Sequence, residues 1–227
     1  MQPRALIFAA AVGLAFASPA HAALVDASTG TSFEPRPKDG GTAFLCLGAG
    51  HRKVLFWTLY AMDFCAEDGK LQTALDGYFA GPGRAHAGLK GKAHARALVD
   101  DQGFFDWLTV APFEKRAEMV FLRGGDAETA RNGFAKNLEK FLGSGAREKE
   151  AIRAFVSVID RPVASGDRAI FVTFPAGELT FSFGANARTL RQDKAVSAFW
   201  GAYLGPDSPL GSMKEAIAEG VAGLRGA

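Results

Sequence analysis

A run of residues that are apolar at nearly every position covers residues 54 to 65 (VLFWTLYAMDFC). Aromatic and other β-favouring side chains dominate it, which predicts a strand. Both alternating sets of positions are apolar, Tyr60, Met62 and Phe64 on one face and Leu59 and Cys65 on the other. A strand of this kind is covered on both faces. We therefore expect it to lie within a sheet against which helices pack.

The remaining patterns place strands early, helices in the middle, and a hairpin and helices at the end. Further strands are predicted over residues 42–47, 117–122, 168–174 and 178–183, the last two joined by a turn at residues 175–177. Five helices are predicted. Two cover residues 93–109 and 196–204, one begins at a cap formed by Asp126, one ends near Pro162, and the last begins at Ser208-Pro209. This order predicts an α+β fold, an antiparallel β-sheet with a layer of helices on one face.

The first residues have the pattern of a secretory signal peptide. Arg4 supplies a positive charge, residues 5–17 are almost wholly apolar, and Ala20-His21-Ala22 forms an A-x-A cleavage site. We expect cleavage after residue 22 and a periplasmic or secreted protein, with an uncleaved N-terminal anchor as the alternative. Residues 23–41 are expected to be an irregular lead-in, and residues 42–227 a single domain. No later stretch has the length and apolar character of a membrane span.

Composition excludes some classes of protein. The 26 Lys and Arg residues nearly balance the 24 Asp and Glu residues, whereas nucleic-acid binding requires a clustered basic surface. His86 and His94 are too far apart for joint metal ligation and lack acidic or thiol partners, so no metal is expected. We expect a monomer without a cofactor or a nucleic-acid partner.

Three segments, in the same order and at similar spacings, resemble the chalcone isomerase family. FLCLGAGHRKVLFWTLYAMDFCAE resembles its Gly-x-Gly-x-Arg hairpin, and FFDWLTVAPFEKRAEMVFLRG its helix, Pro-Phe-Glu-Lys turn and next strand. ELTFSFGANARTLRQDKAVSAFWGAYLG resembles its closing hairpin and Lys-Ala-Val-Ser helix. The resemblance covers residues 42 to 224 and implies the chalcone isomerase-like fold. The family includes flavanone-forming enzymes, non-catalytic helpers and fatty-acid-binding proteins, and exported bacterial members look like the non-catalytic branch.

The family's catalytic positions are mostly not matched. Arg52 matches the arginine that stabilises negative charge in the enzymes, and Tyr60 stands at the position of a catalytic threonine. The other catalytic positions correspond to Asp126, Thr129, Gly133 and Ala202. No catalytic residue is therefore assigned, and enzymatic activity is left undecided, with a non-catalytic role favoured.

Arg52 and Tyr60 are the predicted ligand-binding residues. A guanidinium suits a planar carboxylate, and Tyr60 can add a hydrogen bond from the same face or from across a tight hairpin. The resemblance implies a small amphipathic carboxylate, a fatty acid being favoured, bound in an apolar cleft. Alternatively Arg52 pairs with Asp63 or Glu67, and Tyr60 is a core residue. At the level of function, the alternatives are an isomerase or lyase that uses Arg52 as an electrostatic stabiliser, and a ligand-free scaffold.

Cys46 and Cys65 are the only cysteines. They lie in neighbouring predicted strands on either side of a turn expected at GAGHRK, and an exported chain meets an oxidising compartment. They therefore form a candidate disulfide. The alternative is two buried thiols that are out of register.

Overall fold

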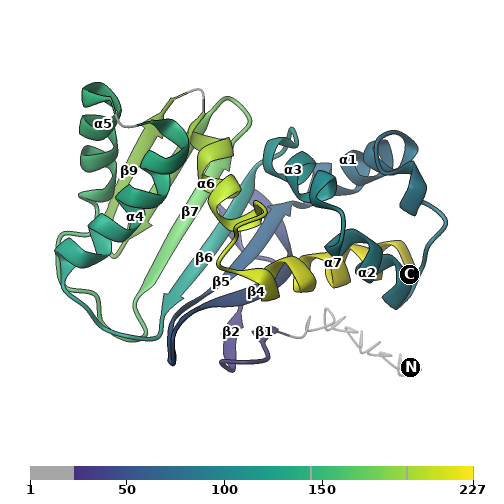
Figure 1. The fold of residues 1–227 in the computed structure, drawn as a ribbon, viewed down its shortest axis with the longest axis horizontal. Coiled ribbons are helices and arrows are strands. Elements are labelled where there is room, and N and C mark those ends of the chain that lie inside the picture. The colour runs from purple at the N-terminus through teal and green to yellow at the C-terminus, as the bar shows by residue number, and fades with distance from the viewer. Residues whose placement is uncertain (1–22, 144, 193, 227) are drawn as a thin grey trace, which may run out of the picture.

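The computed structural model describes residues 23–143, 145–192 and 194–226. Its centre is a seven-stranded sheet whose strands follow one another in chain order, every neighbouring pair antiparallel (Figure 1). The strands are β3 (Lys38–Asp39), β4 (Thr42–Val54), β5 (Trp57–Glu67), β6 (Lys115–Phe121), β7 (Arg168–Phe174), β8 (Glu178–Phe183) and β9 (Asn186–Arg191). The predicted signal peptide lies outside the described residues.

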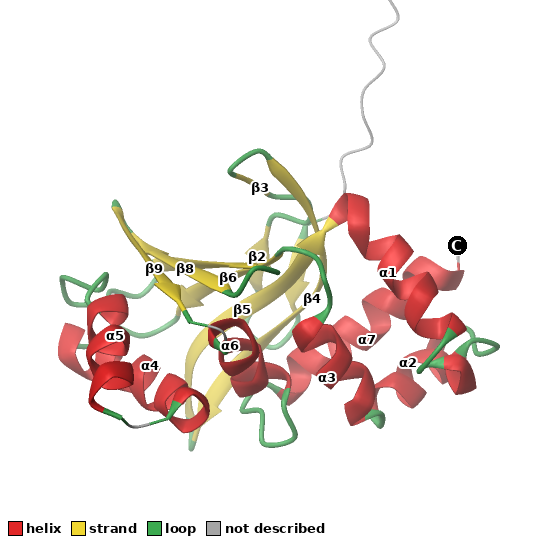
Figure 2. Cartoon of the chain, turned by 90° about the horizontal axis from the view of Figure 1, so that it is seen from above, coloured by secondary structure: helices red, strands yellow, loops and turns green. Residues whose placement is uncertain are grey.

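The helices gather on one side of this sheet, as Figure 2 shows. They are α1 (Asp68–Ala80), α2 (Gly91–Val99), α3 (Gln102–Val110), α4 (Ala127–Leu142), α5 (Ala146–Val156), α6 (Ala195–Leu204) and α7 (Gly211–Gly226), with a short 3₁₀ helix, η1 (Arg84–His86). The α+β arrangement predicted from the sequence is thus confirmed. Among the described residues, no helix has the length and apolar character needed to cross a membrane.

The segment expected to be an irregular lead-in contains regular structure. Residues 23–41 hold the hairpin of β1 (Leu24–Asp26) and β2 (Thr31–Phe33), and also strand β3. Phe33 packs with Ala49, Ala61 and Val120 in a small cluster separate from the main core. This hairpin therefore covers part of the sheet face that the helices leave open.

The first long hairpin turns later in the chain than the sequence suggested. We expected the turn at GAGHRK, but β4 continues through that segment, and the turn lies at Leu55 and Phe56, with Val54 paired to Trp57. The prediction failed because glycines were interpreted as turn residues.

Gly48 and Gly50 instead allow helix α7 to lie directly on β4. A Cβ atom on Gly48 would lie 2.5 Å from the backbone carbon of Ala216, and one on Gly50 would lie 2.4 Å from the backbone nitrogen of Met213. Glycine within a strand commonly marks such a close approach. On the helix side, a Cβ atom on Gly220 would lie 2.0 Å from the carbonyl oxygen of Leu47.

Most other elements follow the sequence, with three exceptions. The helix predicted over residues 93–109 is divided into α2 and α3, because the Asp101 side chain accepts a hydrogen bond from Gly103 N–H and caps a new helix. Helix α1 and strand β9 were not predicted. The Asp126 cap of α4, which accepts from Thr129 N–H at 2.7 Å, and the β7–β8 hairpin are confirmed.

Candidate ligand-binding site

A cavity of about 380 Å³ lies between the sheet and helix α4, and we call it the α4 cavity. Its apolar lining comes from β5, β6, α4 and the segment before β7: Leu59, Phe121, Ala130, Phe134 and Val163. The polar and charged side chains that line it are Arg52, Tyr60, Arg123, Asp126, Thr129, Lys136, Asn137 and Tyr203. It thus combines an apolar wall with several polar and charged side chains, and small-molecule sites likewise pair apolar lining with polar groups that fix the ligand's orientation.

The pairing of β4 with β5 brings the two predicted binding residues together. Arg52 and Tyr60 are direct partners across the hairpin, and the register shifts immediately after them, where Lys53 pairs with Thr58. This β-bulge leaves Leu59 without a register partner on β4. Successive strand residues normally point to opposite faces, yet Leu59 and Tyr60 both line the α4 cavity. The bulge therefore turns the side chains of both residues toward the α4 cavity.

A third group, the hydroxyl of Tyr203 on α6, completes the polar end of the cavity. Burial raises the pKa of the Tyr60 hydroxyl, and the adjoining Arg52 and Tyr203 side chains lower it only in part. Burial, together with Tyr60, raises the pKa of Tyr203 well above its ordinary value. Both phenols are therefore protonated near neutral pH. With the Arg52 guanidinium, they form a set of hydrogen-bond donors suited to an anion.

Arg52 does not pair with the carboxylates considered from the sequence. Asp63 accepts a hydrogen bond from Glu118 N–H and lies 3.8 Å from Arg116, and Glu67 pairs with Lys70 at 3.0 Å. In the described part of the chain, none of the ion pairs includes Arg52. That alternative is wrong because Asp63 lies an odd number of residues from Tyr60 along β5 and so points to the opposite face.

Sequence comparison with the chalcone isomerase pattern pointed to Ala202 on α6, but its neighbour Tyr203 is the residue that lines the α4 cavity. Ala202 lines a second hollow instead. Adjacent helical residues point about 100° apart, so an alignment uncertain by one residue selects the wrong side chain. The Tyr203 side chain is only 2% exposed, so it packs in the core as well as lining the cavity.

Three positions that correspond to catalytic residues of the resembling family also line the α4 cavity. They are Asp126, Thr129 and Gly133. The Asp126 carboxyl caps α4 by accepting a hydrogen bond from Thr129 N–H. This hydrogen bond lowers the pKa of Asp126 below its ordinary value. A Cβ atom on Gly133 would meet no atom within 4 Å. Because glycine has no side chain, this position leaves open space along the lining of the α4 cavity.

A second hollow of about 590 Å³, the α6 cavity, adjoins the first. Arg52 and Asn137 line both. The second is bordered by charged groups, among them Lys194 and the Lys140–Asp207 ion pair at 3.4 Å. Arg52 thus lies where the two cavities adjoin, and the lining of each contains both apolar and charged side chains.

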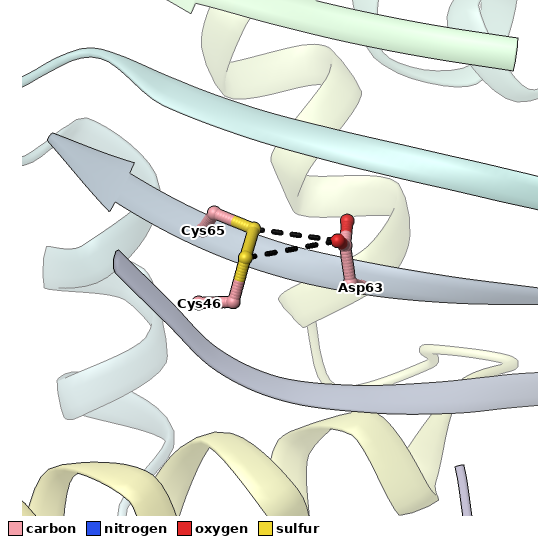
Figure 3. A group of neighbouring side chains, drawn as sticks. All are labelled: Cys46, Asp63 and Cys65. Carbon is pink, nitrogen blue, oxygen red and sulfur yellow. Dashed lines mark hydrogen bonds between the residues drawn. A yellow bond between two sulfur atoms is a disulfide. The ribbon is translucent and has the colours of Figure 1, made fainter. Parts of the chain in front are cut away.

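The two cysteines lie on the sheet face opposite the Tyr60 side chain. Cys46 and Cys65 are register partners with a Cα–Cα distance of 3.8 Å, and their sulfur atoms are bonded at 1.98 Å (Figure 3). Asp63 Oδ2 lies 3.4 Å from Cys65 Sγ and 3.8 Å from Cys46 Sγ. These three residues also form a group close enough to hold a metal ion, but bonded sulfurs offer no thiolate ligand.

Comparisons with known proteins identify the fold. No protein-family model matches this chain, and no curated protein sequence does. Among solved structures, it is similar to the crystal structure of the fatty-acid binding protein AtFAP1 of Arabidopsis thaliana, with a TM-score of 0.69 and 19% sequence identity. The match covers 90% of this chain and 99% of that chain. The chain therefore has the chalcone isomerase-like fold that its sequence motifs implied.

Proposed function

We propose that this protein is an exported, non-catalytic carrier that binds a fatty acid in the α4 cavity. The observation that carries the proposal is the polar end of that cavity, where the Arg52 guanidinium, free of any protein carboxylate in the described residues, adjoins the buried hydroxyls of Tyr60 and Tyr203. The fold shared with a fatty-acid binding protein supports it.

The geometry assigns a role to each part of the ligand. The carboxylate accepts hydrogen bonds from Arg52 and from the neutral Tyr60 hydroxyl, and the Tyr203 hydroxyl orients that group by donating to it. The alkyl chain lies along the apolar wall formed by Leu59, Phe121 and Phe134. Each methylene buried there contributes about 0.8 kcal/mol. Affinity therefore rises with chain length until the cavity is full.

The same donors would stabilise an enolate, which is the requirement of an isomerase or lyase. That reaction also needs a group to accept or deliver a proton. Asp126, the one carboxylate that lines the α4 cavity among the described residues, is engaged in capping α4 and has a lowered pKa. A binding role therefore fits these residues better, and a panel of chalcones with an absorbance readout tests the enzymatic alternative directly.

Lipid extracted from the purified protein tests the proposal. Mass spectrometry should find fatty acids with the wild type and far less with Gly133→Leu, because Gly133 lines the cavity and the new side chain would occupy space there. Gly77→Leu is the matched control, since Gly77 is a helical glycine on α1 whose Cβ would also meet nothing within 4 Å. A wild type that carries no fatty acid, or equal amounts in all three proteins, would contradict the proposal.

A further inference from the structure

The turn between β4 and β5 exposes an unusual set of side chains. Val54, Leu55, Phe56 and Trp57 are 40%, 82%, 88% and 53% exposed. They account for four of the eight exposed large hydrophobic residues among those described, the other four being scattered. We call residues 54–57 the apolar turn. It lies at the end of the long β4–β5 hairpin, at the edge of the molecule in Figure 1.

The backbone of the apolar turn is strained at Leu55. Leu55 has φ of 53° and is the one non-glycine residue with positive φ in the described part of the chain. Such a conformation costs about 1–3 kcal/mol for a residue with a branched side chain. Glycine or asparagine would remove most of that cost. A strained, exposed leucine therefore points to a use for its side chain outside the fold.

Cations adjoin the apolar turn. Lys53 precedes it and is exposed, and the Arg123 guanidinium lies 3.5 Å from the centre of the Trp57 ring. Arg123 also lines the α4 cavity, as Arg52 does. The apolar turn, the side chains of Lys53 and Arg123, and the α4 cavity therefore adjoin one another.

We propose that the apolar turn inserts into the surface of a bilayer containing anionic phospholipid and so places the α4 cavity at the membrane. Leu55 and Phe56 would enter the acyl boundary, Trp57 would lie at the interface that tryptophan favours, and Lys53 and Arg123 would meet anionic headgroups. The choice of a bilayer as the partner rests on the proposed function, because a carrier of fatty acids must exchange them with lipid.

The size of the apolar turn argues against a protein partner. Four side chains of this kind bury at most several hundred Å². A stable interface between proteins buries about 1,200–2,000 Å². Insertion into lipid has no such requirement, because a few apolar side chains and neighbouring cations suffice for reversible binding.

Vesicle flotation tests the inference. The wild type should float with vesicles of phosphatidylcholine and phosphatidylglycerol in a 3:1 ratio, and less with phosphatidylcholine alone. The double variant Leu55→Asn/Phe56→Ser should bind at least about tenfold more weakly, since two exposed apolar side chains are lost. Lys53→Gln should bind the anionic vesicles about fivefold more weakly. Val110→Ser, which removes a 67% exposed side chain elsewhere, is the matched control and should bind like the wild type.

Tryptophan fluorescence supplies a second readout in the same samples. Trp57 is half exposed, Trp107 is partly buried and Trp200 is fully buried. A blue shift on adding anionic vesicles should therefore come from Trp57, and quenching by brominated acyl chains should locate its ring in the interface. Both signals should disappear in the double variant.

The outcomes separate this inference from the proposed function. Loss of vesicle binding in the double variant, with octanoate binding in lipid-free buffer retained, supports it. A wild type that floats with neither vesicle, or a double variant that floats as well as the wild type, overturns it. Dimerisation that the double variant abolishes also overturns it and assigns the turn to self-association. A wild type that floats but binds no octanoate contradicts the fatty-acid proposal alone.

Discussion

Buried ionisable side chains of this protein lie on both faces of β5, and their environments differ. On one face, Tyr60 adjoins Arg52 and the α4 cavity. On the other, Asp63 is completely buried beside the disulfide, and burial raises its pKa from 3.8 to about 7 in spite of nearby Arg116. The first environment is open to a ligand, whereas the second is closed.

The raised pKa of Asp63 predicts a pH dependence of stability. Because the folded-state pKa lies above the unfolded value, the folded state binds the proton more tightly, and its contribution to stability is complete below pH 3.8 and is lost as the pH rises to about 7. Asp63→Asn removes this titration. The free energy of unfolding of the wild type relative to that variant, from urea denaturation, should therefore fall across this range. A difference that is constant or increases with pH would contradict the assignment.

At the scale of elements, the contact between α7 and β4 depends on glycine. Gly220 and Gly223 are both on α7, but only Gly220 meets a strand, at Leu47. Gly220→Ala should lower the free energy of unfolding by about 1–3 kcal/mol through overpacking. Gly223→Ala, whose Cβ meets nothing within 4 Å, should raise it by up to about 1 kcal/mol through helix propensity. Urea denaturation of the two variants measures the difference, and equal effects would refute the contact.

The disulfide is a second link at this scale. It joins β4 and β5 across a sequence separation of 19 residues, and the chain-entropy account gives such a bridge about 3 kcal/mol. Titration of thiols in the denatured, unreduced protein should find none, and reduction should lower the melting temperature. Two reactive thiols in the unreduced protein would show that the bridge does not form.

The sequence predicts the strands better than it predicts the contacts between distant elements. The β7–β8 hairpin and the Asp126 cap depend on local chemistry and were found at the expected residues. Gly48 and Gly50 were misread because a glycine required for a turn and one required by a helix far away in the chain have the same local pattern. Arg52 was predicted from a family motif. Tyr203 was missed, because the rotation of α6 decides which of its side chains faces the cavity.

At the scale of the whole molecule, export remains a prediction. The apolar segment and the A-x-A site predict a mature N-terminus at Ala23. The intact mass of protein recovered from the cell envelope or the medium should match a chain that begins there. Recovery of the full-length mass from that fraction would contradict cleavage and favour an uncleaved anchor.

The central claim is that Arg52 anchors a carboxylate, and calorimetric titration with a medium-chain fatty acid and its methyl ester tests it most directly. Loss of a buried charge partner costs about 2–5 kcal/mol, so Arg52→Ala should bind the acid roughly 30- to several-thousand-fold more weakly. Arg52→Lys should recover part of this affinity, and Tyr60→Phe and Tyr203→Phe should each lose about fivefold. The ester lacks the negative charge, so Arg52→Ala should weaken its binding far less than that of the acid. Equal binding of the acid by the wild type and Arg52→Ala would contradict the claim.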